Sequence, residues 1–184
     1  KPFYGLVNTV FKYDNDSKIN LSENELRLWV ALKADGYEYR PSKFRVRLKK
    51  ERKIKRFSEM FSHRIDRFVE KTTDGYSEFY VTAEGCNKKL SQFMMCSRKD
   101  AKVIFDEMMY WDGCIRDSNR YGSFSTCVKE DADAAQYFGT ILGYKSNILT
   151  YDRIGKTHVV AGKEYIRKSV EYEVNFTTRN RVHY

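Results

Sequence analysis

The sequence predicts an α+β protein in which one unit, helix–strand–strand–helix–strand–strand, occurs twice about a pseudo-two-fold axis. Two apolar helical segments, 28–36 and 105–113, each end in Asp-Gly. Their acids, Asp35 and Asp112, are 77 positions apart (112 minus 35). Strand-like segments follow both helices in the same order, so we expect two similar halves. The expected division is an N-terminal extension, 1–20, a first half, 21–96, and a second half, 97–184.

The two helical segments share their start and stop signals. A serine followed three residues later by an acid is a helix N-cap signature, and it occurs as Ser22 with Glu25 and as Ser97 with Asp100. A glycine follows each motif acid. We expect these glycines, Gly36 and Gly113, to adopt the left-handed C′ conformation that ends many helices.

Asp35 and Asp112 stand at predicted helix C-termini, where the helix dipole is negative and a carboxylate is disfavoured unless a cation binds it. If the two helices pack side by side, both acids reach one point and form an oxygen-rich site of the kind that Mg²⁺ prefers. The alternative for either acid alone is an ordinary Asp-Gly turn after a helix. The repetition at matching positions favours the metal site.

The two segments resemble the paired motifs of the LAGLIDADG homing endonucleases, particularly the intein-type, single-chain members with both motifs on one polypeptide. Residues 28–36 keep the first leucine and the closing Ala-Asp-Gly, and residues 105–113 keep the apolar frame and the Asp-Gly. The resemblance covers roughly residues 20–180. It implies a pseudo-two-fold duplicated αββαββ fold with an antiparallel β-saddle that binds DNA. Small residues usually line the contact between the motif helices, and Trp111 departs from that pattern.

The resemblance also implies a divalent cofactor, Mg²⁺ or Mn²⁺. Asp35 and Asp112 would bind the ion through their carboxylates. Ala34 and Trp111, which directly precede them, would contribute backbone carbonyl oxygens. We therefore expect the ion at the point where the two motif helices meet.

A lysine near the acids is the third expectation from the resemblance. Lys88 falls on the position of the family's active-site lysine, although Ser91 replaces a proline of the family pattern. Such a cation would stabilise charge on the phosphate or orient the attacking water. The alternatives are Lys89 and an ordinary surface lysine. In the second half Arg181 falls opposite Lys88, and Lys156 is a looser candidate.

The chain carries a net charge of +9, and one segment holds the whole excess. Residues 40–67 contain twelve Lys or Arg and three acids, whereas the remainder has 22 basic and 22 acidic residues. This concentration is typical of a polyanion-binding surface. Residues 43–49 alternate cationic and apolar side chains, which predicts a strand with one basic and one buried face. The alternative is an ordinary solvated strand face.

The remaining elements of the first half are expected as a strand over 37–40, a helix over 51–61 and strands near 68–72 and 76–82. Thr73-Asp74-Gly75 is a hairpin signal between the last two. The helix has an apolar stripe, and we expect its cations to face solvent or phosphate. These cations are Arg52, Lys53, Lys55 and Arg56.

The second half repeats this order, with strands over 114–117 and 121–126, a helix over 129–142, a strand over 145–151, a basic loop, and a last strand over 170–177 that corresponds to 76–82. Both halves should contribute to DNA binding, the first more strongly. The expected contact residues are Arg40, Lys43, Arg45, Arg47 and Lys49 in the first half, and Arg116, Arg120, Lys145, Lys156 and Arg181 in the second.

The four cysteines have no zinc-ligand spacing. Scattered thiols and the lack of a visible targeting segment favour a cytoplasmic protein. Since no apolar run approaches the ~20 residues needed to cross a bilayer, we expect no membrane association.

These observations predict a site-specific, metal-dependent endonuclease that hydrolyses phosphodiester bonds in both strands of a long DNA duplex and acts as a monomer. One alternative is a non-cleaving nucleic-acid-binding protein on the same scaffold, either a maturase or a regulator. A second is an interaction domain whose basic stripe binds an acidic protein. Metal-dependent cleavage would separate the endonuclease from both, and duplex binding would separate the two alternatives.

Overall fold

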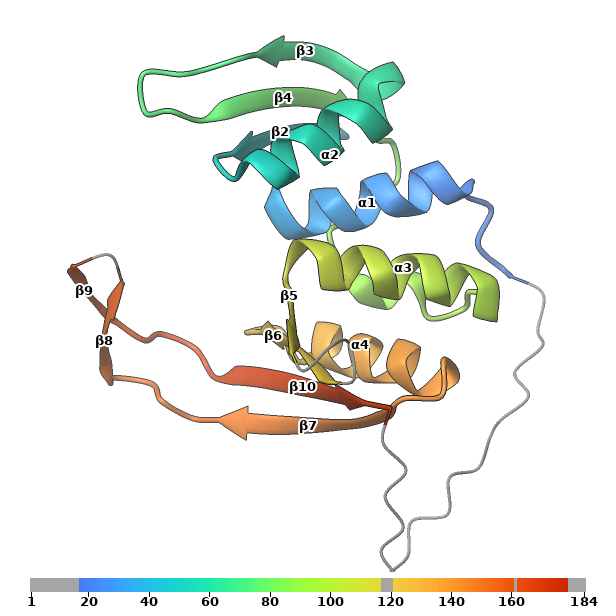
Figure 1. Cartoon of the computed structure of the whole chain (residues 1–184), viewed down its shortest axis with the longest axis vertical. Coiled ribbons are helices and arrows are strands. Elements are labelled where there is room, and N and C mark those ends of the chain that lie inside the picture. Colours follow the sequence, from blue (N-terminus) through green and yellow to red (C-terminus); the bar gives the residue numbers. More distant parts are fainter. Residues whose placement is uncertain (1–16, 117–120, 161, 179–184) are drawn as a thin grey trace, which may run out of the picture.

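A computed structural model of the chain describes residues 17–116, 121–160 and 162–178 (Figure 1). The first half consists of α1 (Glu23–Asp35), β1 (Gly36–Arg40), β2 (Lys43–Leu48), α2 (Glu51–Phe61), β3 (Ile65–Val69) and β4 (Ser77–Thr82). The second half consists of α3 (Arg98–Trp111), β5 (Gly113–Arg116), β6 (Tyr121–Thr126), α4 (Lys129–Ile141), β7 (Lys145–Tyr151) and β10 (Glu171–Thr177). Additional short elements are the 3₁₀ helices η1 (Ser62–Arg64) and η2 (Leu90–Phe93) and the strands β8 (Thr157–Val160) and β9 (Lys163–Ile166).

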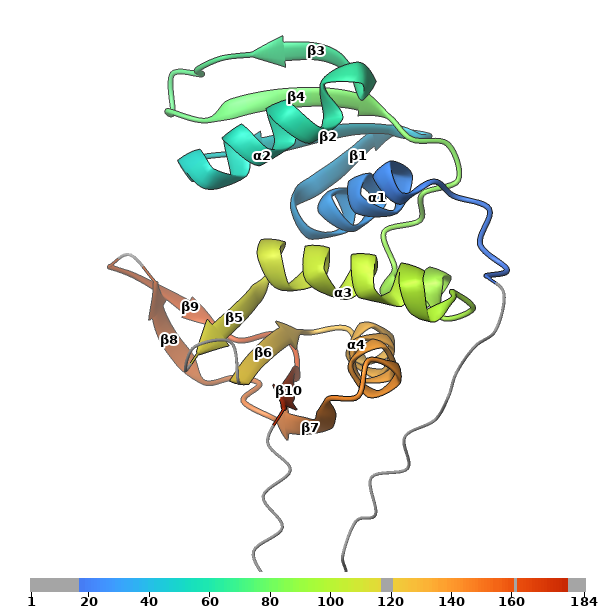
Figure 2. The same ribbon diagram turned by 45° about the vertical axis from the view of Figure 1, so that its right-hand side comes forward.

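Each half has a four-stranded antiparallel sheet with the same arrangement of strands. The order is β1-β2-β4-β3 in the first sheet and β5-β6-β10-β7 in the second, so β10 takes the place of β4. The motif helices α1 and α3 lie side by side in the middle of the molecule, with one sheet on either side of the pair (Figures 1 and 2). The predicted α+β fold with two αββαββ units is confirmed.

The segment between β7 and β10 was expected to be a basic loop, and this prediction is wrong. It contains the antiparallel hairpin β8–β9, in which His158 lies opposite Tyr165. The hairpin projects from the far ends of β7 and β10, away from the helices (Figure 1). The corresponding connection in the first half is the short turn between β3 and β4, where Gly75 has a φ of +76°.

Most predicted boundaries agree with the structure, including the helix over 51–61 and the strands over 121–126 and 145–151. The strand expected near 68–72 instead spans 65–69. The hairpin turn itself is Thr73-Asp74-Gly75, as predicted, because the Thr72 amide donates a hydrogen bond to the Tyr76 carbonyl across it at 2.8 Å. Residues 70–72 lie between the end of β3 and this turn.

The glycines after the motif helices have a different role from the one predicted. Gly36 has φ −82° and ψ 146°, an extended conformation, and Gly113 is also outside the left-handed region. A Cβ on Gly36 would lie 2.5 Å from the carbonyl oxygen of Leu32, and one on Gly113 would lie 2.6 Å from the Cα of Met109. Glycine is required because each chain turns sharply into a strand against the last turn of its own helix.

The motif helices contribute to the hydrophobic cores of both halves. Leu26 and Val30 of α1 pack in the second-half core, with Leu90 and Phe93. Trp111 of α3 packs in the first-half core, where its ring centroid lies 6.2 Å from that of Phe57. Trp111 therefore departs from the small-residue pattern because it fills the neighbouring half.

None of the helices in the described part of the chain has the length and apolar character of a membrane span. The described cysteines are all free thiols. Cys86 and Cys96 are buried, whereas Cys114 and Cys127 are exposed.

Candidate metal and nucleic-acid site

The two motif acids face the same cation. Asp35 is the last residue of α1, and Asp112 is the C-cap of α3. The ammonium of Lys53 lies 2.5 Å from a carboxylate oxygen of Asp35 and 3.9 Å from one of Asp112. The two oxygens are thus no farther apart than the sum of these distances. Both helices end next to each other on one side of the molecule (Figure 1).

The prediction that Lys53 faces solvent or phosphate is wrong. Its side chain is only 10% exposed, and its ammonium lies 5.3 Å from the centre of the Trp111 ring. The helical period contains a signal for this position. Lys53 precedes the buried Phe57 by four residues and Phe61 by eight, so it lies on the apolar face of α2.

Burial raises the pKa of the Asp112 carboxyl above its usual range, and the nearby charge of Asp35 raises it further. Lys53, Lys33 and Lys50 act in the opposite direction. Two carboxylates at negative helix ends are electrostatically disfavoured, and the local cations offset part of this cost. A divalent ion would offset more of it.

Lys88 also lies close to the acids. Its ammonium donates a hydrogen bond to the carbonyl oxygen of Gly36, the residue after Asp35. Its own backbone is left-handed, with a φ of +58°. Lys89, the alternative, is exposed at the start of η2.

The second half arranges its charges differently around α4. Asp131 is the third residue of α4, as Lys53 is of α2. It is buried, forms an ion pair with Lys33 at 3.0 Å and accepts a hydrogen bond from the Leu90 amide. Lys156 lies before the β8–β9 hairpin and is exposed. Arg120 and Arg181 lie outside the described residues.

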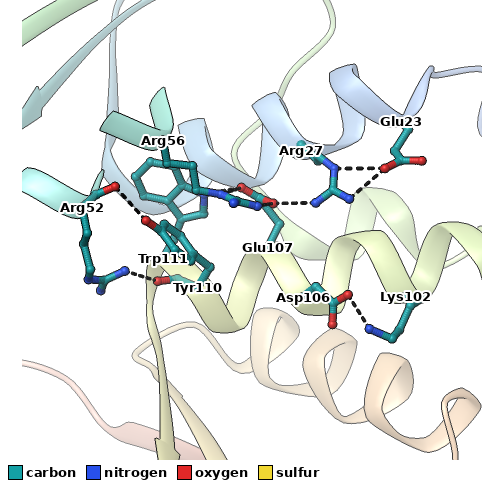
Figure 3. Close-up of polar contacts among 9 residues, drawn as sticks. All are labelled: Glu23, Arg27, Arg52, Arg56, Lys102, Asp106, Glu107, Tyr110 and Trp111. Carbon is teal, nitrogen blue, oxygen red and sulfur yellow. Dashed lines mark hydrogen bonds and ion pairs between the residues drawn. The ribbon is translucent and has the colours of Figure 1, made fainter. Parts of the chain in front are cut away.

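A buried carboxylate, Glu107, holds three helices together beside the acids (Figure 3). Its side chain is fully buried on α3 and forms ion pairs with Arg27 of α1 at 2.9 Å and Arg56 of α2 at 2.6 Å. It also accepts a hydrogen bond from the indole nitrogen of Trp111 at 2.9 Å. These contacts fix α2, and with it the backbone of Lys53, against the motif helices.

Arg52 also was expected to be solvated, and it too connects α2 to α3. Its guanidinium donates to the Tyr110 carbonyl at 2.9 Å, and the Tyr110 hydroxyl donates to the Arg52 carbonyl at 2.7 Å (Figure 3). Arg56 lies over the Tyr110 ring at 4.3 Å. Of the four cations of α2, Arg52 and Lys55 are exposed, as predicted, and Lys53 is buried.

The open face of the first sheet carries cations interleaved with tyrosines. Phe44, Val46 and Leu48 of β2 are buried, which places the alternating cations on the opposite side of the sheet. We call this side the basic face. Its residues are Tyr37, Lys43, Arg45, Arg47, Arg67 and Tyr80.

The charges of the basic face are not equally available. Arg47 forms ion pairs with Asp74 at 3.0 Å and Glu78 at 2.9 Å. Arg45 lies 5.8 Å from the Tyr37 ring and forms no ion pair among the described residues. Arg40 is exposed at the end of β1, and Lys49 is exposed just after β2. Arg45 is thus better placed than Arg47 to bind a phosphate.

The open face of the second sheet carries fewer cations than the basic face. Asn175 of β10 lies opposite Asn147 of β7 and Ser123 of β6, and Ser125 and Glu173 are on the same side. We call Asn147, Asn175, Ser123 and Ser125 the polar face. Asn147 and Ser125 are exposed, whereas Asn175 and Ser123 are buried. Lys145 is exposed at one end of it, and Arg116 ends β5. The predicted excess of charge on the first half therefore corresponds to a real difference between the two sheets.

The donors near Asp35 and Asp112 suit a hard divalent ion. Carboxylate oxygens are its preferred ligands, and the last carbonyls of α1 and α3, including those of Ala34 and Trp111, lack intrahelical partners. The described part of the chain has no group of three or more His, Cys, Asp or Glu placed to hold a metal. An ion here would complete its coordination with backbone carbonyls, water or phosphate.

Comparison with solved structures identifies the architecture. A mesophilic variant of the homing endonuclease I-DmoI superposes with a TM-score of 0.57, covering 87% of this chain and 91% of that one. The chain has the LAGLIDADG fold. I-DmoI in complex with DNA and Mn superposes with a TM-score of 0.56, covering 89% and 94%. The N-terminal LAGLIDADG domain of WhiA gives 0.50, covering 83% and 76%.

Sequence similarity to these LAGLIDADG structures is low. Identity is 16% for both I-DmoI structures and 10% for the WhiA domain. No protein-family model and no curated protein matches the chain. The LAGLIDADG resemblance seen in the motifs thus agrees with the fold, and the intein-type subgroup stays a prediction.

Proposed function

We propose that this protein is a site-specific, divalent-metal-dependent endonuclease that cuts both strands of a DNA duplex. The observation that carries the proposal is the pair Asp35 and Asp112, one acid from each half, sharing one cation at the junction of two sheets. Structures of I-DmoI that contain DNA with Mg, Mn or Ca support both the partner and the cofactor. One chain supplies both acids, which favours an active monomer.

In this proposal Asp35 and Asp112 would hold the divalent ion, Mg²⁺ or Mn²⁺, through their carboxylate oxygens. When bound, the ion lowers the pKa of a water molecule and neutralises charge on the leaving oxygen. Lys88, next to Gly36, contributes positive charge where the phosphate becomes more negative. Lys53, whose ammonium lies 2.5 Å from Asp35, could also contribute positive charge near the phosphate. The basic face and the polar face hold the duplex in register.

The second candidate is a DNA- or RNA-binding protein without nuclease activity, a maturase or a regulator. The observation in its favour is the similarity to the LAGLIDADG domain of WhiA, a protein not named as a nuclease. The acid pair argues for cleavage, because the single charge of Lys53 offsets only one of the two carboxylates, and the remaining negative charge beside phosphates disfavours simple DNA binding.

The test is to incubate the protein with a random duplex library and Mg²⁺ and to sequence the ends produced. We expect cleavage within one short sequence, abolished by EDTA and lowered at least about a hundredfold by Asp35→Asn or Asp112→Asn, with DNA binding retained. Asp106→Asn is the matched control, because Asp106 is an exposed acid of α3 paired with Lys102. Unchanged cleavage in both motif variants would refute the proposal, and binding without cleavage by the wild type would favour the second candidate.

A further inference from the structure

Lys53 occupies the point at which both acids would bind a metal ion. Its ammonium is within 4 Å of an oxygen of Asp35 and of Asp112, and its stem is buried beside Trp111. The ammonium neutralises part of the repulsion between the acids in the free protein. A divalent ion that binds the same oxygens would compete with it.

The backbone that carries Lys53 is held in place. Arg56, one turn along α2, is paired with the buried Glu107, and Arg52 exchanges two hydrogen bonds with Tyr110 (Figure 3). Both partners are on α3, next to Asp112. The helix cannot withdraw from the acids without breaking these contacts, so the movable part is the flexible Lys53 side chain.

DNA offers this side chain another anion. A phosphate that approaches the acid pair would bring negative charge to the mouth of the site, and a lysine ammonium binds phosphate as a point charge. Once the ammonium contacts the phosphate, the carboxylate oxygens are available to a metal ion. The phosphate oxygens would add ligands for that ion.

We propose that Lys53 makes metal binding depend on DNA, an inference that rests on the proposed function. In the free protein the Lys53 ammonium occupies the site between Asp35 and Asp112, and it moves to a phosphate when duplex binds. The divalent ion then binds strongly in the complex and weakly without DNA. Because coupling between two ligands is reciprocal, the ion should raise the affinity for DNA by the same factor.

The first measurement is calorimetric titration of Ca²⁺ into the full chain without DNA. Lys53→Met should bind Ca²⁺ about tenfold or more tightly than the wild type, because the competing charge is gone. Lys53→Arg, which keeps the charge, should resemble the wild type. Lys55→Met is the matched control: Lys55 is on the same helix, but its side chain is 71% exposed. Its Ca²⁺ affinity should equal that of the wild type.

The second measurement repeats the titration with a mixed-sequence 30-base-pair duplex at low salt. The wild type should gain about tenfold or more in Ca²⁺ affinity, and the gain of Lys53→Met should be smaller, because only the added phosphate ligands contribute to it. Equal Ca²⁺ affinity of the wild type with and without duplex would overturn the proposal, and this result does not depend on any variant folding. The proposal would also be overturned if folded Lys53→Met, without DNA, bound Ca²⁺ no more tightly than the wild type.

The acid variants separate this proposal from the proposed function. If Ca²⁺ binds the wild type and Lys53→Met equally and binding disappears in Asp35→Asn/Asp112→Asn, the role of Lys53 is wrong and the metal site stands. If Ca²⁺ binding persists unchanged without the two acids, the metal site itself is wrong, and both proposals fall.

Discussion

The carboxyl group of Asp112 is held where its negative charge is disfavoured. Burial and the neighbouring Asp35 both raise its pKa, and Lys53, Lys33 and Lys50 compensate in part. Such a group is more costly to the fold when it is ionised than when it is protonated. Functional residues often reduce stability in this way, because a binding site needs unpaired groups that a ligand will satisfy.

Asp112→Asn should therefore stabilise the metal-free protein near neutral pH. The folded-state pKa of Asp112 lies above the unfolded value of about 3.9, so the ionised acid destabilises the fold at pH values above the folded pKa. This penalty disappears as the pH falls through the folded pKa toward the unfolded one. Thermal unfolding in EDTA at a series of pH values should show a gain for Asp112→Asn that shrinks on acidification. A gain that is absent, or constant with pH, would contradict the assignment.

Substitutions of Gly36 can show whether this position needs a left-handed backbone or the absence of a Cβ. A left-handed glycine commonly tolerates asparagine, whereas a glycine that lacks room for Cβ tolerates no side chain. Since a Cβ here would be 2.5 Å from the Leu32 carbonyl oxygen, we expect Gly36→Asn and Gly36→Ala to lower stability to a similar extent, by about 1–3 kcal/mol. Urea denaturation measures this. Gly75→Asn is the control and should be nearly neutral, because Gly75 is left-handed with open space around it.

At the scale of single elements, the sequence predicts most helices and strands but not what binds at their surfaces. The motif helices were found because cap, apolar run and Asp-Gly repeat. The ion pairs of Lys53 and Arg56 and the hydrogen bonds of Arg52 cannot be predicted from the sequence, because these residues form one polar run that is typical of a solvated helix face. Their partners are 18 to 58 residues away in sequence, on α1 and α3, so they follow only from the packing of three helices.

Glu107, the acid on α3 that pairs with Arg56, is equally hard to recognise from the sequence. An acid among Met108, Met109 and Trp111 looks like an exposed position on an apolar helix. Glu107 lies four residues before Trp111, and this helical spacing places both residues on the buried face of α3. What makes burial possible is the pair of guanidinium groups from Arg27 and Arg56, which no local pattern reveals.

Glu107→Ala should lower the free energy of unfolding by about 3–5 kcal/mol, because it leaves two partly buried arginines without their shared carboxylate. Glu107→Gln should cost less, since the amide oxygen can still accept from Trp111. Chemical denaturation measures both. Asp106→Ala is the matched control on the next residue: the side chains of its pair with Lys102 are both about half exposed, and removing it should change stability by no more than about 0.5 kcal/mol. Equal effects of Glu107→Ala and Asp106→Ala would show that the buried cluster is not stabilising.

At the scale of the whole molecule, the two sheets present different chemistry to a duplex. The basic face suits phosphates, and aromatic rings beside its cations restrict their orientation. The exposed residues of the polar face, Asn147 and Ser125, offer an amide and a hydroxyl group, which suit base edges in the major groove. We therefore expect the first half to supply more affinity and the second half more sequence preference.

Arg45→Ala should weaken duplex binding for all sequences and lower the salt slope of log affinity by about one. Arg47→Ala should have a smaller effect, because Asp74 and Glu78 already pair with Arg47. Asn147→Ala should change sequence preference and leave the salt slope unchanged. Fluorescence anisotropy at several salt concentrations, with a small panel of duplexes, measures both quantities. A unit loss of salt slope in Asn147→Ala, or none in Arg45→Ala, would contradict this division.

The global fold was predictable because its signals are repeated. Each half carries the same order of caps, apolar helices and alternating strands, so an error in one half is corrected by the other. The β8–β9 hairpin has no counterpart in the first half. Residues Lys163 to Ile166 of β9 are all exposed, so this strand has no buried face that would give its sequence an alternating pattern. Repetition gives no information about this segment, so the sequence alone predicts a loop.

The crossing of side chains between the halves limits how this protein can be re-engineered. Leu26 and Val30 complete the core of the half to which they do not belong in sequence, and Trp111 does so in return. A chimera that joins the first half to a foreign second half would leave Trp111's place vacant and two aliphatic residues without matching neighbours. New target specificities are therefore more accessible by redesigning the strands than by recombining halves, unless α1 and α3 are transplanted together.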